Sequence, residues 1–122
     1  FNVNPAQVSW KANAKDVYVS IDQAVPCSLI INEMITNSLK YAFPQGRKGE
    51  ITISFTLEDH NYILDYRDNG VGVAPGANLE RAGSLGMQLI NGLTRQLDGK
   101  LSIETAAGVH YTIIFPQKQK GE

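Results

Sequence analysis

The sequence predicts an α/β protein, a two-layer sandwich in which helices cover one face of a mixed, largely antiparallel sheet. Alternating strand-like segments and segments with apolar residues at helical spacing follow one another in the order strand, helix, strand, strand, helix, strand, strand. A length of 122 residues with 43% hydrophobic side chains fits one globular core. We therefore expect residues 1–122 to form a single domain. Because the chain begins with Phe1 rather than Met, we expect it to be excised from a longer protein.

The first half of the chain contains two strand-like segments and a long helix. Residues 8–12 and 17–21 alternate apolar and polar side chains, as strands do. Asp22 and Pro26 mark the start of a helix, and residues 44–46, which include a proline and a glycine, mark its end. The apolar stripe of this helix has a period of 3.6 residues and consists of Ile31, Met34, Ile35, Leu39 and Ala42.

The second half contains two predicted hairpins and a second helix. Residues 50–57 and 62–67 are predicted to pair around the four polar residues between them. Residues 101–104 and 111–115 are predicted to form the closing hairpin. The helix between the hairpins ends at Asp98-Gly99. Its apolar stripe consists of Leu85, Leu89, Ile90, Leu93 and Leu97.

Charge and cysteine content exclude several classes of function. A net charge of -1, with scattered basic residues, argues against a nucleic-acid partner or direct contact with an anionic membrane. Cys27 is the only cysteine, so the chain has no internal disulfide and no cysteine cluster for zinc. No apolar run approaches the roughly 18 residues that span a bilayer. We expect a cytoplasmic protein.

Three polar segments form a plausible nucleotide site. Glu33, Asn37 and Lys40 fall within an arc of about 60° on the first helix, roughly opposite its apolar stripe. Residues 68–72, Asp-Asn-Gly-Val-Gly, place a carboxylate beside a glycine-framed turn directly after a predicted strand. Residues 83–86, Gly-Ser-Leu-Gly, open the second helix, where backbone amides could approach a phosphate.

Each segment taken alone also has a simpler explanation. A polar arc is what any solvent-exposed helix face gives, although Asn32, Thr36 and Asn37 are weak helix formers for such a face. Residues 69–70, Asn-Gly, are typical of a hairpin turn, although residues 71–76 carry two glycines and a proline in place of a returning strand. Residues 83–86 could simply cap a helix.

The order and spacing of the three segments are more specific than any one of them. Residues 29–43 resemble the N box of the ATPase and kinase superfamily that contains gyrase, Hsp90, histidine kinases and MutL. Residues 68–72 resemble its first glycine box and residues 83–90 its second, and the resemblance extends over residues 17–116. Residues 40–42, Lys-Tyr-Ala, look most like a sensor histidine kinase. The resemblance implies the Bergerat-type ATP-binding fold.

The resemblance also implies roles for the residues of the first two segments. Asp68 would accept a hydrogen bond from the adenine amino group, and Gly70 and Gly72 belong to the same glycine box, where Gly72 would leave room for the purine. Asn37 would supply an oxygen to Mg2+, a cation that takes few ligands from protein.

The remaining implied roles concern the phosphates and the transfer step. Lys40 would neutralise phosphate charge and Tyr41 would flank the nucleotide. Glu33 would act as a general base or orient the phosphoacceptor. The phosphates would be held by the backbone of Ser84, Leu85, Gly86 and Met87.

These roles imply the catalytic domain of a cytoplasmic sensor histidine kinase that uses Mg-ATP. Its phosphoacceptor would be a histidine of an upstream dimerisation domain in the same protein, because His60 and His110 lack the acidic helical surroundings of a phosphorylated histidine. The further partners would be a response regulator and, in the full-length protein, a second copy. Two alternatives stay open: a protein serine kinase of the anti-sigma-factor type, and a nucleotide-sensing module that transfers no phosphate.

Overall fold

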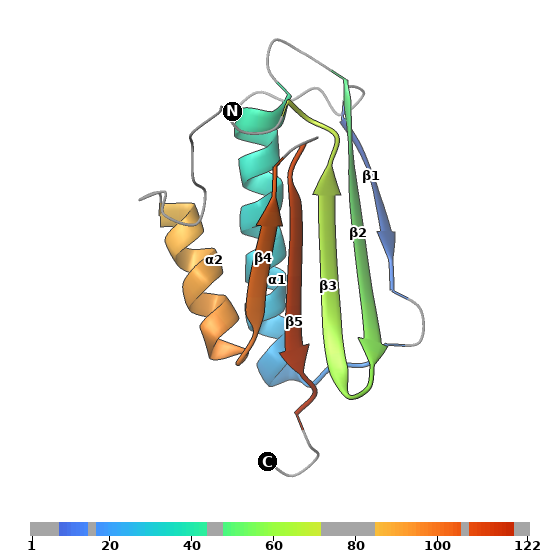
Figure 1. Ribbon diagram of the computed structural model, residues 1–122, viewed down its shortest axis with the longest axis vertical. Helices are drawn as coiled ribbons and strands as arrows, with labels where there is room; N and C mark the ends of the chain where they lie inside the picture. The colour runs from blue at the N-terminus through green and yellow to red at the C-terminus, as the bar shows by residue number, and fades with distance from the viewer. Residues whose placement is uncertain (1–7, 15–16, 44–47, 72–84, 106–107, 119–122) are drawn as a thin grey trace.

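In the part of the chain that the structure describes, two helices lie on one face of a five-stranded sheet (Figure 1). The computed structural model describes residues 8–14, 17–43, 48–71, 85–105 and 108–118. Helix α1 comprises Ile21–Asn37 and helix α2 comprises Leu85–Gln96. Neither of these helices combines the length and apolar character that a membrane crossing requires.

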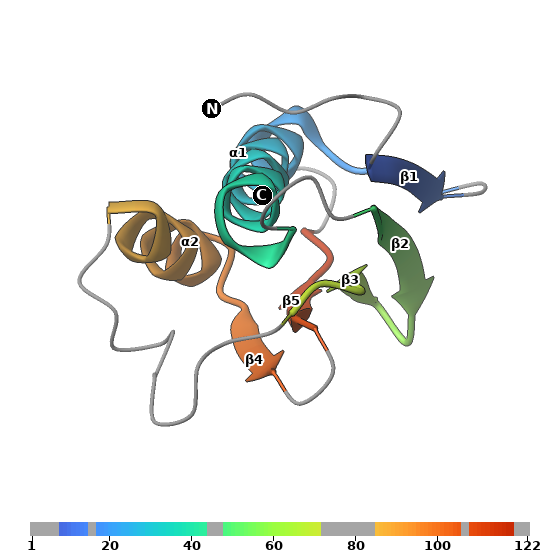
Figure 2. The same ribbon diagram turned by 90° about the horizontal axis from the view of Figure 1, so that it is seen from above.

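The sheet is mixed and largely antiparallel, as predicted. Its strands are β1 (Val8–Asn13), β2 (Gly49–Glu58), β3 (Asn61–Asp68), β4 (Lys100–Glu104) and β5 (His110–Pro116). Their order is β1-β2-β3-β5-β4, in which β1 and β2 are parallel and the other three pairs are antiparallel. Figure 2 shows α1 above the middle of the sheet and α2 beside it, with β1 lying away from both described helices.

The hydrophobic core lies between the helices and the sheet. Strands β3 and β5 alternate strictly between core-facing and outward-facing residues, which the period of two in the sequence predicted. Each fully buried large side chain contributes about 1.5–3 kcal/mol of hydrophobic free energy. The largest of these are Tyr62, Tyr66, Tyr111, Phe115, Ile30, Met34, Leu64, Met87, Ile90 and Ile113.

Two turns explain where the predicted elements end. The β2–β3 hairpin closes through Asp59 and His60, whose φ angles of 50° and 67° suit the right-handed twist of paired strands. At the end of α2, Asp98 has a φ of 57°, and its amide donates to the carbonyl of Arg95. The amide of Gly99 donates to the carbonyl of Thr94, which completes a Schellman motif at the predicted Asp98-Gly99 stop.

The strand predicted over residues 17–21 is wrong. Residues 17–20 have no regular secondary structure and Ile21 is the first residue of α1. The carbonyl of Ser20 accepts the amides of Gln23 and Ala24, so this residue begins the helix. The carbonyl of Tyr18 accepts a hydrogen bond of 2.6 Å from the Tyr62 hydroxyl, which satisfies this backbone acceptor without a neighbouring strand.

The predicted apolar stripes are partly wrong in their orientation. On α1, Met34 and Ala42 are buried, whereas the remaining stripe members are half-buried. On α2, Leu85 is 70% exposed and Leu89 is exposed, while Met87 lies in the core. Both helices carry apolar residues on more than one side, so the spacing alone did not decide which side faces the sheet.

Candidate functional site

The C-terminal end of α1 changes its helical geometry. Ser38–Ala42 forms a π-helical turn, η1, which continues directly from α1 and confirms helical structure up to the region of the predicted stop. Such turns are rare in proteins, and many of those that occur lie at functional sites. The wider turn redirects the side chains that follow. In η1, Ser38 is buried and Lys40 is exposed.

Asp68, at the end of β3, is the buried carboxylate of the site. It is 5% exposed, and its Oδ1 accepts the backbone amides of Gly70 and Val109, each at 3.0 Å. Its Oδ2 accepts the Ser38 hydroxyl at 2.6 Å. A carboxylate has about four acceptor positions. Three of them are therefore filled by protein donors, and one position on Oδ2 stays open among the described residues.

A buried tyrosine hydroxyl lies behind Ser38. The Tyr66 hydroxyl is 2.6 Å from the Ser38 oxygen and 3.2 Å from the carbonyl oxygen of Met34. Burial raises the pKa of Tyr66 far above its ordinary value, and the charge of Asp68 adds to this effect. The hydrogen bond to Ser38 opposes it. This hydroxyl is therefore a neutral donor at physiological pH.

Two glycines allow the backbone to pack closely around Asp68. A Cβ on Gly70 would overlap the side chain and backbone of Ala42 in η1. The amide of Val71 donates to the Ala42 carbonyl at 3.0 Å, which ties the glycine turn to η1. Gly108 has a φ of +87°, and a Cβ there would overlap the carbonyl of Asp68. Among the predicted site glycines, Gly70 is thus required for a steric reason, since any side chain there would overlap Ala42.

The start of α2 meets the polar side of α1. A Cβ placed on Gly86 would lie 3.1 Å from Glu33 Oε2 and 3.4 Å from Asn37 Oδ1. Both side chains are half-buried, so this part of the predicted arc is not a solvent-exposed face. A side-chain hydrogen bond joins Asn37 to Tyr111. The structure therefore brings together Glu33, Asn37 and Gly86, three of the predicted site residues.

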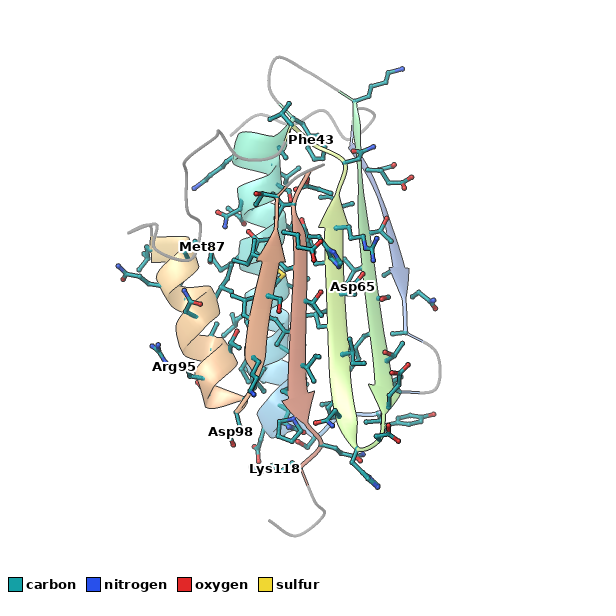
Figure 3. The ribbon with its side chains drawn as sticks, viewed as in Figure 1. Phe43, Asp65, Met87, Arg95, Asp98 and Lys118 are labelled. Atoms are coloured by element: carbon teal, nitrogen blue, oxygen red, sulfur yellow. The ribbon has the colours of Figure 1, made fainter. Side chains whose placement is uncertain are left out.

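The other predicted residues occupy different surroundings. Lys40 is exposed on η1 and Leu85 is exposed at the first position of α2. Met87 is buried in the core below the start of α2, so only its backbone could meet a ligand (Figure 3). Tyr41 lies in η1, and its nucleotide contact stays a prediction. Gly72 and Ser84 lie outside the described residues.

The sequence interpretation missed three polar residues of the site: Ser38, Tyr66 and Tyr111. Tyr66 precedes Asp68 by two residues on a strand, so both side chains must point to the same face. That spacing was a usable signal. Ser38 had none, because its burial depends on η1, and the contact of Tyr111 with Asn37 depends on the tertiary fold.

His110 belongs to a separate cluster on the outer face of the sheet. Its Nε2 forms a short hydrogen bond with Asp65, and the Thr112 hydroxyl lies 3.2 Å from the same nitrogen (Figure 3 labels Asp65). Arg67 Nε donates to Asp65 at 3.1 Å. Burial acts to raise the pKa of Asp65, but His110 and Arg67 lower it below its ordinary value. This cluster links β3 to β5 and lies apart from Glu33 and Asn37.

An apolar hollow lies on the flank of α1 opposite Glu33 and Asn37, between this helix and the β1–β2 part of the sheet. Its volume is about 720 Å³ and its lining is mostly apolar. The residues around it include Ala12, Cys27, Ile31, Ile35, Ile53 and Phe55. Burial raises the pKa of the Cys27 thiol to about 11, so the thiol is neutral at physiological pH.

The relatives include proteins of two kinds, sensor histidine kinases and anti-sigma F factors. The chain is 31% identical over 104 residues to sensor histidine kinase PdtaS of Mycobacterium tuberculosis, covering 82% of this chain and 21% of that protein. It is 32% identical over 81 residues to anti-sigma F factor of Bacillus licheniformis, covering 66% of this chain and 53% of that protein. The chain thus spans about a fifth of the first relative and about half of the second.

Solved structures and a family model agree on the fold. A blue-light activated histidine kinase of Erythrobacter litoralis matches with a TM-score of 0.86 and 22% identity, over 93% of this chain and 36% of that one. Histidine kinase AdeS of Acinetobacter baumannii matches with a TM-score of 0.77 and 20% identity, over 93% of this chain and 56% of that one. The family model described as histidine kinase-, DNA gyrase B- and HSP90-like ATPase matches residues 22–119. The chain therefore belongs to the family of histidine kinase-, DNA gyrase B- and HSP90-like ATPases.

Proposed function

We propose that this domain binds Mg-ATP and transfers the γ-phosphoryl group to a histidine on an adjacent dimerisation domain, as part of two-component signalling. The observation that carries the proposal is the buried Asp68 carboxylate, held by three donors beside the junction of α1, η1 and the glycine turn. Structural ion networks can also bury a carboxylate. Here, however, three neutral donors surround it, and among the residues that the structure describes one acceptor position is left for a ligand.

Asp68 would select the base. Adenine carries an amino donor at the position where guanine carries a carbonyl oxygen, which is an acceptor. A carboxylate only accepts hydrogen bonds, so it would attract adenine and repel guanine in the same orientation. Gly70 lets the glycine turn pack against Ala42, and Gly72 in the same box would leave the space that a purine needs beside the carboxylate.

Asn37 and Glu33 would serve the phosphate end of the nucleotide. Their oxygens lie near Gly86 at the start of α2, where the helix dipole favours negative charge. Within the described residues, no cluster of three His, Cys, Asp or Glu side chains could hold a metal alone. An amide oxygen together with phosphate and water ligands suits Mg2+, so Asn37 fits this cation. Bound there, Mg2+ would offset the charge that develops on the phosphates.

Further residues would complete the phosphate site and assist the transfer step. Lys40, exposed on η1, would add a mobile positive charge, and Tyr41 would flank the nucleotide. The backbone of Ser84, Leu85, Gly86 and Met87 would hold the phosphates. Glu33 would accept a proton from the attacking histidine or orient it, a role that requires hydrogen-bond reach in the assembled complex.

The proposed partners are an upstream dimerisation and phosphoacceptor domain, a response regulator and a second copy of the full-length protein, all in the cytoplasm. The likeness to PdtaS, of which this chain spans 21%, supports a domain that works within a larger protein. The likeness to anti-sigma F factor over 81 residues favours a second candidate, a protein serine kinase that binds a sigma factor. The third candidate is a nucleotide-sensing module that binds ATP and transfers no phosphate.

Phosphotransfer separates these candidates. The domain would be incubated with radiolabelled ATP and Mg2+, first alone and then with the native upstream segment added in trans. We expect no acid-labile label on the domain alone and a weak acid-labile label on the added segment. The label should be weak because an acceptor added in trans lacks the effective concentration of a tethered acceptor, which is on the order of 1 mM. Acid-stable phosphoserine on a sigma-factor-associated protein would favour the second candidate. ATP binding without any transfer would favour the third.

A further inference from the structure

We infer that Ser38 is a positioning and specificity-determining residue of the base site, acting through Asp68. This inference rests on the proposed adenine contact of Asp68. The Ser38 oxygen lies 2.6 Å from Asp68 Oδ2, and the Ser38 side chain is 3% exposed. The hydroxyl therefore occupies one of the two acceptor positions on the only Asp68 oxygen that the backbone amides leave accessible.

The direction of the hydrogen bonds around Ser38 is fixed by proton count. A serine hydroxyl has one hydrogen, and an ionised carboxylate can only accept. Ser38 must therefore donate to Asp68 and accept from the Tyr66 hydroxyl, which is the other group within 2.6 Å. The hydrogen-bond chain runs from Tyr66 to Ser38 to Asp68. Because Tyr66 is fully buried, water cannot easily replace it as the donor to Ser38.

This series of hydrogen bonds limits which ligand groups Asp68 can bind. The two amides fill Oδ1, and Ser38 fills half of Oδ2, so one acceptor direction remains with respect to the described part of the chain. A single amino donor, as on adenine, matches one acceptor. A carboxylate with more open positions could shift to accept the ring N–H of a hypoxanthine or guanine base instead. Ser38 therefore narrows the choice of base as well as orienting the carboxylate.

The backbone geometry of η1 holds Ser38 in this position. Its amide approaches the carbonyls of both Ile35 and Met34 where α1 passes into the π-helical turn. The Met34 carbonyl oxygen lies 3.2 Å from the Tyr66 hydroxyl oxygen, farther than the Ser38 oxygen, to which the single Tyr66 proton is donated. The position of Ser38 is thus determined by two elements, α1 and β3, that meet at the buried end of the site.

Base selectivity tests the inference. Isothermal titration would compare ADP with inosine diphosphate, which carries a carbonyl oxygen in place of the adenine amino group. We expect Ser38→Ala to lower ADP affinity about tenfold, the lower end for loss of a hydrogen bond to a charged group. We also expect it to reduce the ratio of ADP to inosine diphosphate affinity by a similar factor. Ser28→Ala is the matched control, because the Ser28 hydroxyl lies on the same helix and donates to the Ala24 carbonyl.

Two further variants keep the test decisive. Tyr66→Phe removes the donor behind Ser38 and should lower the selectivity ratio in the same direction, by less. Ser38→Thr keeps the hydroxyl and should restore the ratio if the variant folds. A folded Ser38→Ala protein with an unchanged ratio would overturn the role of Ser38 and leave the proposed function intact. Failure of the unsubstituted domain to bind ADP would overturn the proposed function itself.

Discussion

The two flanks of α1 differ in chemistry although they belong to one helix. Toward α2 the helix presents Glu33 and Asn37, whose oxygens meet Gly86. Toward β1 and β2 it lines the apolar hollow with Cys27, Ile31 and Ile35, which offer almost no hydrogen-bonding groups. A polar side chain can be kept half-buried only where partners satisfy it, and such partners gather on the first flank. Substitutions on the flank toward α2 should alter nucleotide binding and transfer, and substitutions on the flank toward β1 and β2 should alter the stability of the fold.

The largest expected effect is on phosphoryl transfer. Glu33→Ala should lower the rate of labelling of the upstream segment by about 10²- to 10⁴-fold, the usual contribution of general acid-base catalysis. ATP affinity should change little, because the proposed role belongs to the transfer step. Single-turnover labelling and ATP titration on the same preparation would check both. Equal losses of affinity and rate would assign Glu33 to nucleotide binding instead.

Asp68→Asn should be the most damaging substitution for binding. It keeps the shape of the side chain but replaces an acceptor with an amide donor that faces Ser38 or the adenine amino group. We expect ADP affinity to fall by about 1.5 to 3 kcal/mol. Ile31→Ala, on the apolar flank, is the control and should leave ADP affinity unchanged while lowering the melting temperature. Titration calorimetry and thermal unfolding would show whether the flanks separate in this way.

Cys27 makes the apolar flank sensitive to alkaline pH. The folded thiol has a pKa of about 11 against an ordinary value of 9.0, so below pH 9 the thiol is protonated in both the folded and the unfolded chain. Between pH 9 and 11 only the unfolded thiol ionises, and the free energy of unfolding should fall by about 2–3 kcal/mol. Urea unfolding at several pH values would measure this slope. Cys27→Ala should show a shallower slope, because the raised pKa of Tyr66 contributes to the slope in both proteins. An identical slope in both proteins would contradict the assignment.

The smallest effect concerns the metal. Asn37→Ala should weaken ADP binding in the presence of Mg2+ by severalfold more than in its absence, because the proposed contact is to the cation. Titrations with Mg2+ and with a chelator would give the difference. An equal loss under both conditions would make Asn37 a direct nucleotide contact or a structural partner of Tyr111.

Periodicity predicted the order and type of the elements because core-facing and outward-facing residues alternate strictly on β3 and β5, and such alternation indicates a strand. The same rule failed at residues 17–21, where an extended segment alternates without strand pairing and Tyr62 satisfies the Tyr18 carbonyl. Residue spacing placed Glu33 and Asn37 on one helix face, but their meeting with Gly86 depends on how α1 and α2 pack. The predicted roles of Gly72 and Ser84 stay predictions.

The change from α1 to η1 could not be predicted, because local propensities do not distinguish an α-helix from a π-helical turn. Propensity correctly indicated a helix through Ala42. It gave no sign that Ser38 would be buried beneath Asp68, a position fixed by contacts with β3. The part of the site that decides base selectivity therefore came from tertiary packing.

A π-helical turn is equivalent to an α-helix with one inserted residue, which gives η1 a consequence for sequence length. Deleting a single residue within Ser38–Ala42 would let the α-helical ladder continue unbroken. Every later residue of the turn would rotate by about 100° around the helix axis. Ala42 would then no longer pack against Gly70, although every other residue of the site would still be present. The geometry of the base site thus depends on residue count at this point as well as on residue identity.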